Sequence, residues 1–566
     1  MAGPSKGPER HRREKTPHPT PSLGHLLPKG EGEGFPTLSR GERVAAMRRR
    51  VRGLVPGPHS GTVKLRLPPR QSRGSPNGSA AAHLMATQLT VETTIFPPLS
   101  AGVDELAPRA PSLVLVRNSL LATLLAAPLA FGAVQPWAWG ALALAAFLLL
   151  LFWSISSARE GRIKILWSPL YVPAGFLFLL GMVQFAGHLT MDSMATREAL
   201  VKLSTDIILF FLAGQIFSAP TSERERLKTS WHRVRQRSAE APGTHILCAS
   251  PLRWTLVLYT FLLALFAIFQ FFSSDGLIYW TVPSPGWTFG PYVNHNHYAG
   301  LMEMLIPLSV ASALPALRKQ STAAVAGCVI LIPIASLLLS ASRGGFISLL
   351  VEVVLAAVLV FWCGPRHARR LTALVGGSAL VAAALLFFWM APRHVAERLA
   401  RMGDGTHPPE VELRNRLVAA RDSLGIWRDH AWLGAGLGSF ETAFPRYQSF
   451  PSDALWDHAH NDYAEALAET GVAGAAAILS ALGLFFWLAF RNLRERLRHR
   501  AGWMQFAAAL GCCGFLVHSF ADFNFHIPAN AAWFVVCAAM ATSVSRTSPG
   551  RGNRSADLEV STHRPT

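Results

Sequence analysis

The chain has 566 residues, of which 50% are hydrophobic and only 15% charged, and its mean hydropathy is +0.27. A soluble globular chain carries about a quarter of charged residues. The composition therefore excludes a mostly disordered protein, a collagen-like fibre and a disulfide-rich secreted module, and it predicts an all-α integral membrane protein. The formal net charge of +19 does not indicate nucleic-acid binding, because nearly half of it lies in a polar N-terminal segment.

That segment, residues 1–115, is predicted to be a disordered basic head. Its first 110 residues are rich in Pro, Gly, Arg and Ser and have no sustained apolar periodicity, so they cannot bury enough surface to offset the entropy of ordering. The densest basic cluster, at 48–52, suits contact with anionic lipid headgroups. A translation start further along, at Met85, explains the head equally well, and the sequence leaves both explanations open.

About twelve apolar segments after the head approach the roughly 20 residues that a helix needs to cross the hydrocarbon core. Helices are expected because lipid offers the backbone no hydrogen-bonding partner outside the segment. The predicted spans are 116–135, 137–156, 166–186, 204–219, 253–272, 298–315, 323–341, 346–363, 371–391, 471–490, 503–520 and 530–545. The chain is thus divided into spans one to nine (116–391), a loop domain (392–470), spans ten to twelve (471–545) and a tail (546–566).

The orientation follows from the basic loops. Clusters of Lys and Arg come after every even-numbered span, and such clusters mark the cytoplasmic side. With the basic head also inside, we expect a multi-pass protein of the bacterial inner membrane with both termini in the cytoplasm. The long loop between spans nine and ten is then periplasmic.

Unusual polar residues occur where the predicted spans meet the external face. His297 comes just before span six, and Glu303 lies about a turn and a half inside it, where a charge is costly unless it faces a polar interior. Arg343, in the sequence Ser-Arg-Gly-Gly, lies between spans seven and eight. A planar guanidinium at the start of a helix suits a phosphate group. The alternative is a tight hairpin whose arginine reaches lipid headgroups.

The long loop is predicted to contain an amphipathic helix. Apolar residues recur there at intervals of four and three: Leu413, Leu417, Ala420, Leu424 and Trp427. Three arginines spaced seven apart share another face, Arg414, Arg421 and Arg428. Arg416 lies apart from both sets. The glycine-rich run at 434–438 has no strand before it, so a turn into a helix is favoured over a nucleotide site.

His460 lies near the end of the long loop. It belongs to one of two His-x-His pairs, at 295–297 and 458–460, which raise the possibility of zinc. No further pattern fixes a metal site, so a neutral imidazole acting as a general base is favoured and no metal is predicted. Asp462 and Glu465 resemble a helix N-cap and its capping-box partner, which would leave His460 exposed just before the helix. Asp522 follows span eleven on the same side.

These motifs together resemble the O-antigen ligase/polymerase family of bacterial envelope glycosyltransferases. The resemblance rests on Ser342-Arg343-Gly344, on Asp429-His430 followed by 433–440, on His460-Asn461 followed by nine residues and Gly471-x-x-Gly474, and on 518–530. It covers about 290–530, is weaker over 116–290 and is absent from the head. Ala464 departs from the leucine that is common in the family.

The resemblance implies transfer of a glycan from an undecaprenyl-pyrophosphate carrier at the periplasmic face, as in lipopolysaccharide biosynthesis, without metal, nucleotide or other cofactor. His460 would be the catalytic histidine. Arg343 would bind pyrophosphate, with Arg416, His297, Glu303 and Asp522 as further substrate-binding residues. The acceptor would be another glycan, the lipid A core or a protein.

Three alternatives remain at this point. A polymerase of the same family shares the motifs. A polysaccharide transporter or flippase would place its binding residues near the midplane and often shows repeats, whereas no repeat is seen here and the polar residues lie at one face. A structural envelope protein would leave Glu303 without a role.

Overall fold

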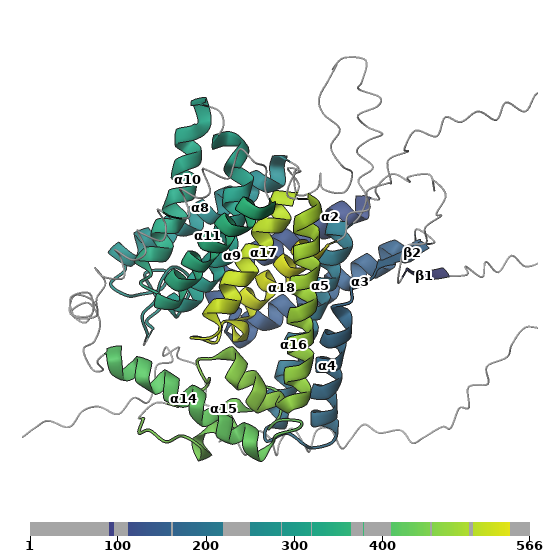
Figure 1. Cartoon of the computed structure of the whole chain (residues 1–566), viewed down its shortest axis with the longest axis vertical. Coiled ribbons are helices and arrows are strands. Elements are labelled where there is room, and N and C mark those ends of the chain that lie inside the picture. Colours follow the sequence, from purple (N-terminus) through teal and green to yellow (C-terminus); the bar gives the residue numbers. More distant parts are fainter. Residues whose placement is uncertain are drawn as a thin grey trace, which may run out of the picture. The chain divides into compact units, whose positions relative to one another are not determined.

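The computed structural model describes residues 90–94, 111–159, 162–218, 250–284, 286–317, 320–363, 377, 409–452, 455–496 and 502–543. All of them belong to one unit, Met85–Thr566. Helices dominate this part of the chain (Figure 1). They are α2 (Pro111–Ala126), α3 (Pro136–Arg159), α4 (Tyr171–Ala186), α5 (Ser193–Ser218), α8 (Ser250–Ser273), α9 (His295–Leu317), α10 (Gln320–Leu339), α11 (Arg343–Cys363), α14 (Pro409–Asp429), α15 (Phe440–Ala443), α16 (Asp462–Arg496), α17 (Gly502–His518) and α18 (Pro528–Thr542).

Seven of the described helices are long and apolar enough to cross a membrane, and four more are apolar but shorter. Each predicted span falls on one of these helices, except 371–391, which lies outside the described residues apart from the single residue 377. The prediction of a mostly helical, multi-pass membrane protein is confirmed. Its count of about twelve spans remains a prediction.

Short 3-10 turns and two strands complete the described elements. The turns are η1 (Ala127–Leu129), η2 (Phe131–Ala133), η4 (Phe444–Arg446) and η5 (Asn524–His526). Strand β1 (Thr90–Thr94) pairs in parallel with β2 (Arg162–Leu166), with Thr90 opposite Arg162. β1 and the first residues of α2 fall within the segment 1–115, whose disorder stays a prediction. β-branched residues occur in both strands and suit an extended pair.

The centre of the bundle is formed by α9, α17 and α18. Helix α17 packs on α9, α11 and α18, and α18 packs on α5. The outer face of α3 instead exposes large apolar side chains such as Leu144, Leu148 and Leu151, as expected for a helix surface that faces lipid.

Helix α16 begins nine residues earlier than the predicted span. It bends at Gly471, whose φ of 62° and ψ of −163° are not helical. The N–H groups of Val472 and Ala473 therefore donate to the carbonyl groups of Ala431 (2.8 Å) and Trp432 (3.1 Å). The segment 462–470, predicted as the end of the loop, is thus the first part of a helix that a glycine divides.

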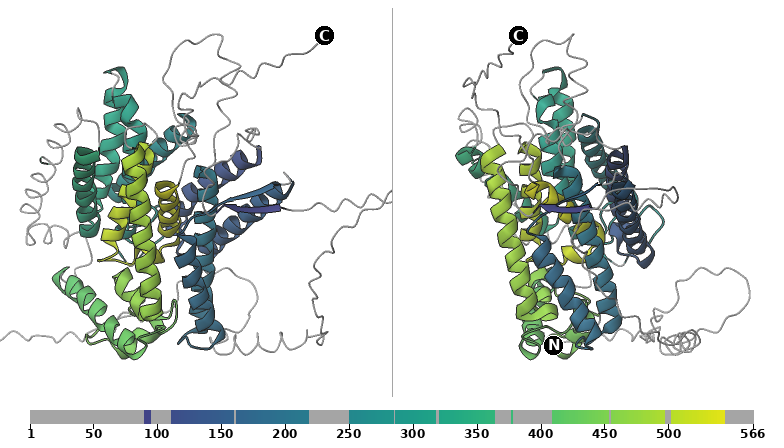
Figure 2. Two further views of the ribbon diagram at one scale, coloured as in Figure 1. Left: turned by 45° about the vertical axis from the view of Figure 1, so that its right-hand side comes forward. Right: turned by 90° about the vertical axis from the view of Figure 1, so that its right-hand side faces the viewer.

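Helices α14 and α15 lie at the end of the bundle where α16 begins (Figures 1 and 2). Helix α14 confirms the predicted helix in the long loop, but the buried side is not the predicted stripe. Leu417 is 67% exposed, whereas Ala419, Ser423 and Ile426 are buried. Small residues are buried because α14 packs against α16 and because the segment around Tyr447 approaches α14 closely. For example, Gly425 lies against the ring of Tyr447.

Candidate active site where the long loop meets the bundle

Asp522 is the centre of a cluster drawn from four parts of the chain. Its carboxylate is fully buried in the turn between α17 and α18. Oδ1 lies 3.4 Å from Nδ1 of His460 and 3.8 Å from Nε2 of His297, and Oδ2 lies 3.9 Å from Nη1 of Arg416. The structure thus brings together four of the six predicted site residues.

The charge of Asp522 is maintained by these neighbours. Burial alone would raise the pKa of its carboxyl group, but His297, His460 and the positive charge of Arg416 hold that pKa well below its usual range. A buried carboxylate of this kind can orient an imidazole and offset the charge of a guanidinium.

His460 is placed by the start of α16. Its backbone has a φ of 50°, a left-handed conformation that turns the chain into the helix. The side-chain oxygen of Asn461 accepts hydrogen bonds from the N–H groups of Tyr463 (3.1 Å) and Ala464 (3.0 Å). Asn461 is therefore the N-cap, and the prediction that Asp462 caps the helix is wrong.

The region around His460 is also fastened to the end of α17. The Asn461 side chain donates to the carbonyl of Phe520 (3.0 Å), and the N–H of Asp462 donates to that of Ser519 (3.0 Å). Because Asp522 follows in the same turn, these bonds fix the separation between His460 and its carboxylate partner.

The nine residues between Asn461 and Gly471 have a structural explanation. They form the first helical segment of α16, from the N-cap to the bend. A Cβ on Gly471 would lie 2.5 Å from the carbonyl carbon of Trp432, and one on Gly434 would lie 2.2 Å from that of Glu469. The glycine-rich run therefore crosses α16 in direct backbone contact and leads into α15, in agreement with the predicted turn.

Arg416 reaches the cluster because it lies one turn before Ala419 on the packed side of α14. Arg414, Arg421 and Arg428 are exposed, as their separate face predicted. The helix thus directs one arginine to Asp522 and the other three to solvent.

The other two predicted site residues, Glu303 and Arg343, lie outside the Asp522 cluster, at a buried pair of side chains and at the start of α11. Oε1 of Glu303 lies 2.7 Å from Nδ1 of His518, and both side chains are buried. A Cβ on Gly344 would lie 2.3 Å from the His518 ring, and one on Gly345 would lie 3.4 Å from Oε1 of Glu303. The first turn of α11 therefore rests directly on this pair, and the side chain of Arg343 at the helix start is exposed.

Sequence reasoning missed His518, which pairs with Glu303, and Phe523, which packs against three histidines. The Phe523 ring centroid lies 4.2 Å from that of His458, 4.7 Å from that of His297 and 4.9 Å from that of His460. Both lie in the segment 518–530 on which the family resemblance rests, but no local pattern assigns them these partners, because the contacts are distant in sequence.

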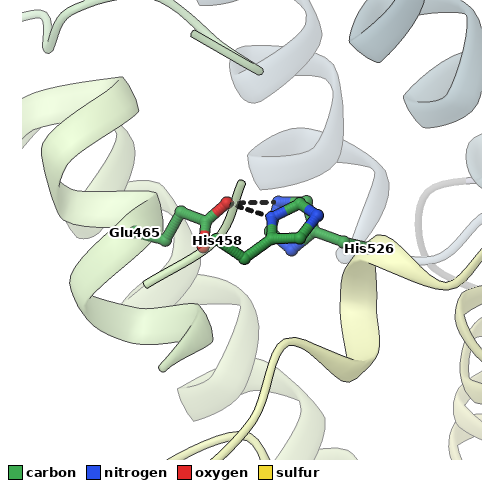
Figure 3. A group of neighbouring side chains, drawn as sticks. All are labelled: His458, Glu465 and His526. Atoms are coloured by element: carbon green, nitrogen blue, oxygen red, sulfur yellow. Dashed lines mark hydrogen bonds and ion pairs between the residues drawn. The ribbon is translucent and has the colours of Figure 1, made fainter. Parts of the chain in front are cut away.

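The predicted His-x-His pairs do not form chelating pairs. His295 is directed at the carbonyl of Ser340 (2.8 Å), while His297 approaches Asp522. Instead, His458 joins Glu465 and His526 (Figure 3), and this is the one group of three such side chains with suitable metal-ligand spacing among the described residues. Burial would lower the pKa of His526, but the carboxylates of Glu465 and Asp462 raise it to about 10.

The comparisons with known proteins agree with the resemblance inferred from the motifs. Residues 328–479 match the family model described as O-antigen ligase. The matched segment contains Arg343, Arg416 and His460 but not His297, Glu303 or Asp522. No curated protein matches the chain. The match over 328–479 supports the O-antigen ligase family for this chain, and with it an enzyme of the glycosyltransferase-like ligase type.

Proposed function

We propose that the protein transfers a glycan from an undecaprenyl-pyrophosphate carrier to an acceptor hydroxyl at the periplasmic face of the inner membrane. The observation that carries this proposal is the convergence of His460, His297 and Arg416 on Asp522, at the junction of the long loop with the apolar helices. A lipid-linked donor needs such a junction, because its lipid stays among the helices while its glycan extends into water.

In the proposed reaction the acceptor oxygen attacks the anomeric carbon of the donor sugar. The bond from that carbon to the pyrophosphate oxygen breaks, and the hydroxyl proton passes to Nε2 of His460, whose Nδ1 faces Asp522. The departing lipid pyrophosphate carries the electron pair. Arg343 and Arg416 stabilise its charge as guanidinium groups, so the transfer requires no metal ion at the reacting atoms.

The choice of donor follows from energy supply. No nucleotide triphosphate is available outside the inner membrane, so the donor must arrive already activated. A pyrophosphate ester supplies the leaving group. The periplasmic side follows from the positive-inside orientation, with both termini in the cytoplasm.

The experiment that tests this function is a deletion strain in which the lipid-linked glycans are extracted and sized. A missing ligase leaves long chains on undecaprenyl pyrophosphate, and a missing polymerase leaves single repeat units. Restoring the gene should clear the accumulated species. An unchanged lipid-linked pool, with glycan trapped on the cytoplasmic side, would instead indicate a flippase.

Arg343→Lys separates a pyrophosphate ligand from a residue that merely reaches lipid headgroups. Lysine keeps the charge but cannot form two parallel hydrogen bonds with a phosphate. Loss of one charged hydrogen bond, worth about 1.5–3 kcal/mol, corresponds to a loss of roughly 10–100-fold in transfer. The rate is measured with the purified protein and a lipid-linked donor.

The matched control is Arg421→Lys, because Arg421 is exposed on α14. It should transfer at the parental rate. Full activity of Arg343→Lys would contradict the pyrophosphate role and favour headgroup contact.

A further inference from the structure

His458, Glu465 and His526 come from three separate elements and direct one ligand atom each at a common point (Figure 3). His458 lies in the loop before α16, Glu465 in the first turn of α16 and His526 in η5. Oε1 of Glu465 is 2.7 Å from Nδ1 of His458 and 3.2 Å from Nε2 of His526. All three ligand atoms lie within 4.8 Å of one another.

The outer atoms of this cluster are also held. Nδ1 of His526 lies 3.1 Å from Oδ1 of Asp462, and Oε2 of Glu465 accepts the N–H of Ala459 at 2.8 Å. A carboxylate behind a histidine and a donor behind a carboxylate are the partners that orient metal ligands in proteins. The cluster therefore has both three candidate metal ligands and the hydrogen bonds that fix the orientation of those ligands.

The cluster has an excess of negative charge. Asp462 and Glu465 are buried, and burying carboxylates is costly unless a cation compensates them. With neutral imidazoles the group carries two negative charges, which a single dication balances. A proton on His526 is the competing way to supply positive charge.

We propose that His458, Glu465 and His526 bind a divalent transition metal ion, with zinc as the metal that this donor set fits. Two imidazole nitrogens and one carboxylate oxygen are zinc ligands, at about 2.0–2.2 Å from the ion and hence about 3.3 Å from each other in a tetrahedral site. The separations of 2.7 Å and 3.2 Å from Oε1 of Glu465 need only a small expansion to reach this value. The side chains of His458 and His526 are 23% and 30% exposed, which gives solvent access to a fourth position.

The role of the metal is structural. It fastens the segment 458–460 to α16 and η5, next to Phe523, whose ring stacks on His458 and packs edge-on against His460. The metal is not among the atoms that the proposed transfer uses, and its binding is measured without any donor, so this proposal stands or fails separately from the proposed function.

The test uses the detergent-solubilised full chain, stripped with a chelator and titrated with Zn²⁺. The parent should bind one equivalent per chain and gain several degrees in its midpoint of thermal unfolding, because a ligand of the folded state stabilises it. Glu465→Gln and His526→Ala should each lose the saturable binding and the thermal shift.

The matched controls are Glu441→Gln and His188→Ala, which alter exposed residues outside the cluster and should bind zinc like the parent. The titration of the parent needs no variant to fold. Absence of saturable binding in the parent would assign the cluster to a proton instead of a metal. Zinc retained by both cluster variants, at parental stoichiometry, would place the metal elsewhere and also overturn the proposal.

Discussion

Replacing His460 by alanine should lower the rate of glycan transfer by about 10²–10⁴-fold, the usual cost of losing a general base. The acceptor hydroxyl must lose its proton as it attacks the sugar carbon. The imidazole of His460 is placed for this by Asp522 at 3.4 Å and by the turn that Asn461 caps. The measurement is single-turnover transfer by purified protein, with donor binding measured in parallel.

The two readouts together distinguish a base from a binding residue. Donor binding should persist in His460→Ala, because the phosphate contacts are assigned to Arg343 and Arg416. His188→Ala, which removes an exposed histidine, should behave like the parent in both. Parental turnover by His460→Ala would remove His460 from the mechanism. If the variant instead loses both turnover and donor binding, His460 is a ligand of the donor.

The helices could be predicted because lipid imposes a simple requirement on sequence. A run of about 20 apolar residues has no other stable conformation in the hydrocarbon core. Their exact ends depend on contacts that no window of sequence contains. Helix α16 shows this: its bend at Gly471 exists because the carbonyl groups of Ala431 and Trp432 accept the freed N–H groups.

The residues of the Asp522 cluster could be named from the sequence, but their arrangement could not. His460, His297, Arg416 and Asp522 were all named from motifs or from their position at the external face. That Asp522 is the residue on which the others converge depends on folding α9, α14 and α17 together. The assignment of the N-cap to Asp462 failed for the same reason, because Asp462 contacts His526, 64 residues away, and Asn461 takes the capping role.

The buried face of α14 was the other failure. An apolar stripe predicts which side of a helix is buried only when large side chains fill the interface. Here α14 lies close to its neighbours through Ala419, Ser423 and Gly425, so the buried side combines small residues with Ile426. That rotation is also what directs Arg416 at Asp522.

Asp522→Asn should lower transfer by about 10²-fold or more, since changing the carboxylate that orients a catalytic imidazole is costly even when shape is kept. The substitution removes a buried negative charge that faces His297 of α9, Arg416 of α14 and His460 of the loop. The guanidinium of Arg416 then loses the buried carboxylate that lies 3.9 Å from its Nη1. Transfer rates and thermal unfolding are measured from about pH 5 to pH 8.

The pH dependence makes this prediction specific. Because the pKa of Asp522 is held well below its usual range, its contribution to stability is fully present above the unfolded pKa of about 3.9 and is lost only as the pH falls through the lower folded value. The titration of Asp522 itself should therefore leave the stability difference between the parent and Asp522→Asn unchanged over the measured range. Asp275→Asn is the control, because Asp275 is exposed and has a φ of 49°, a conformation that asparagine tolerates. An Asp522→Asn protein that is less stable but turns over like the parent would reduce Asp522 to a packing residue.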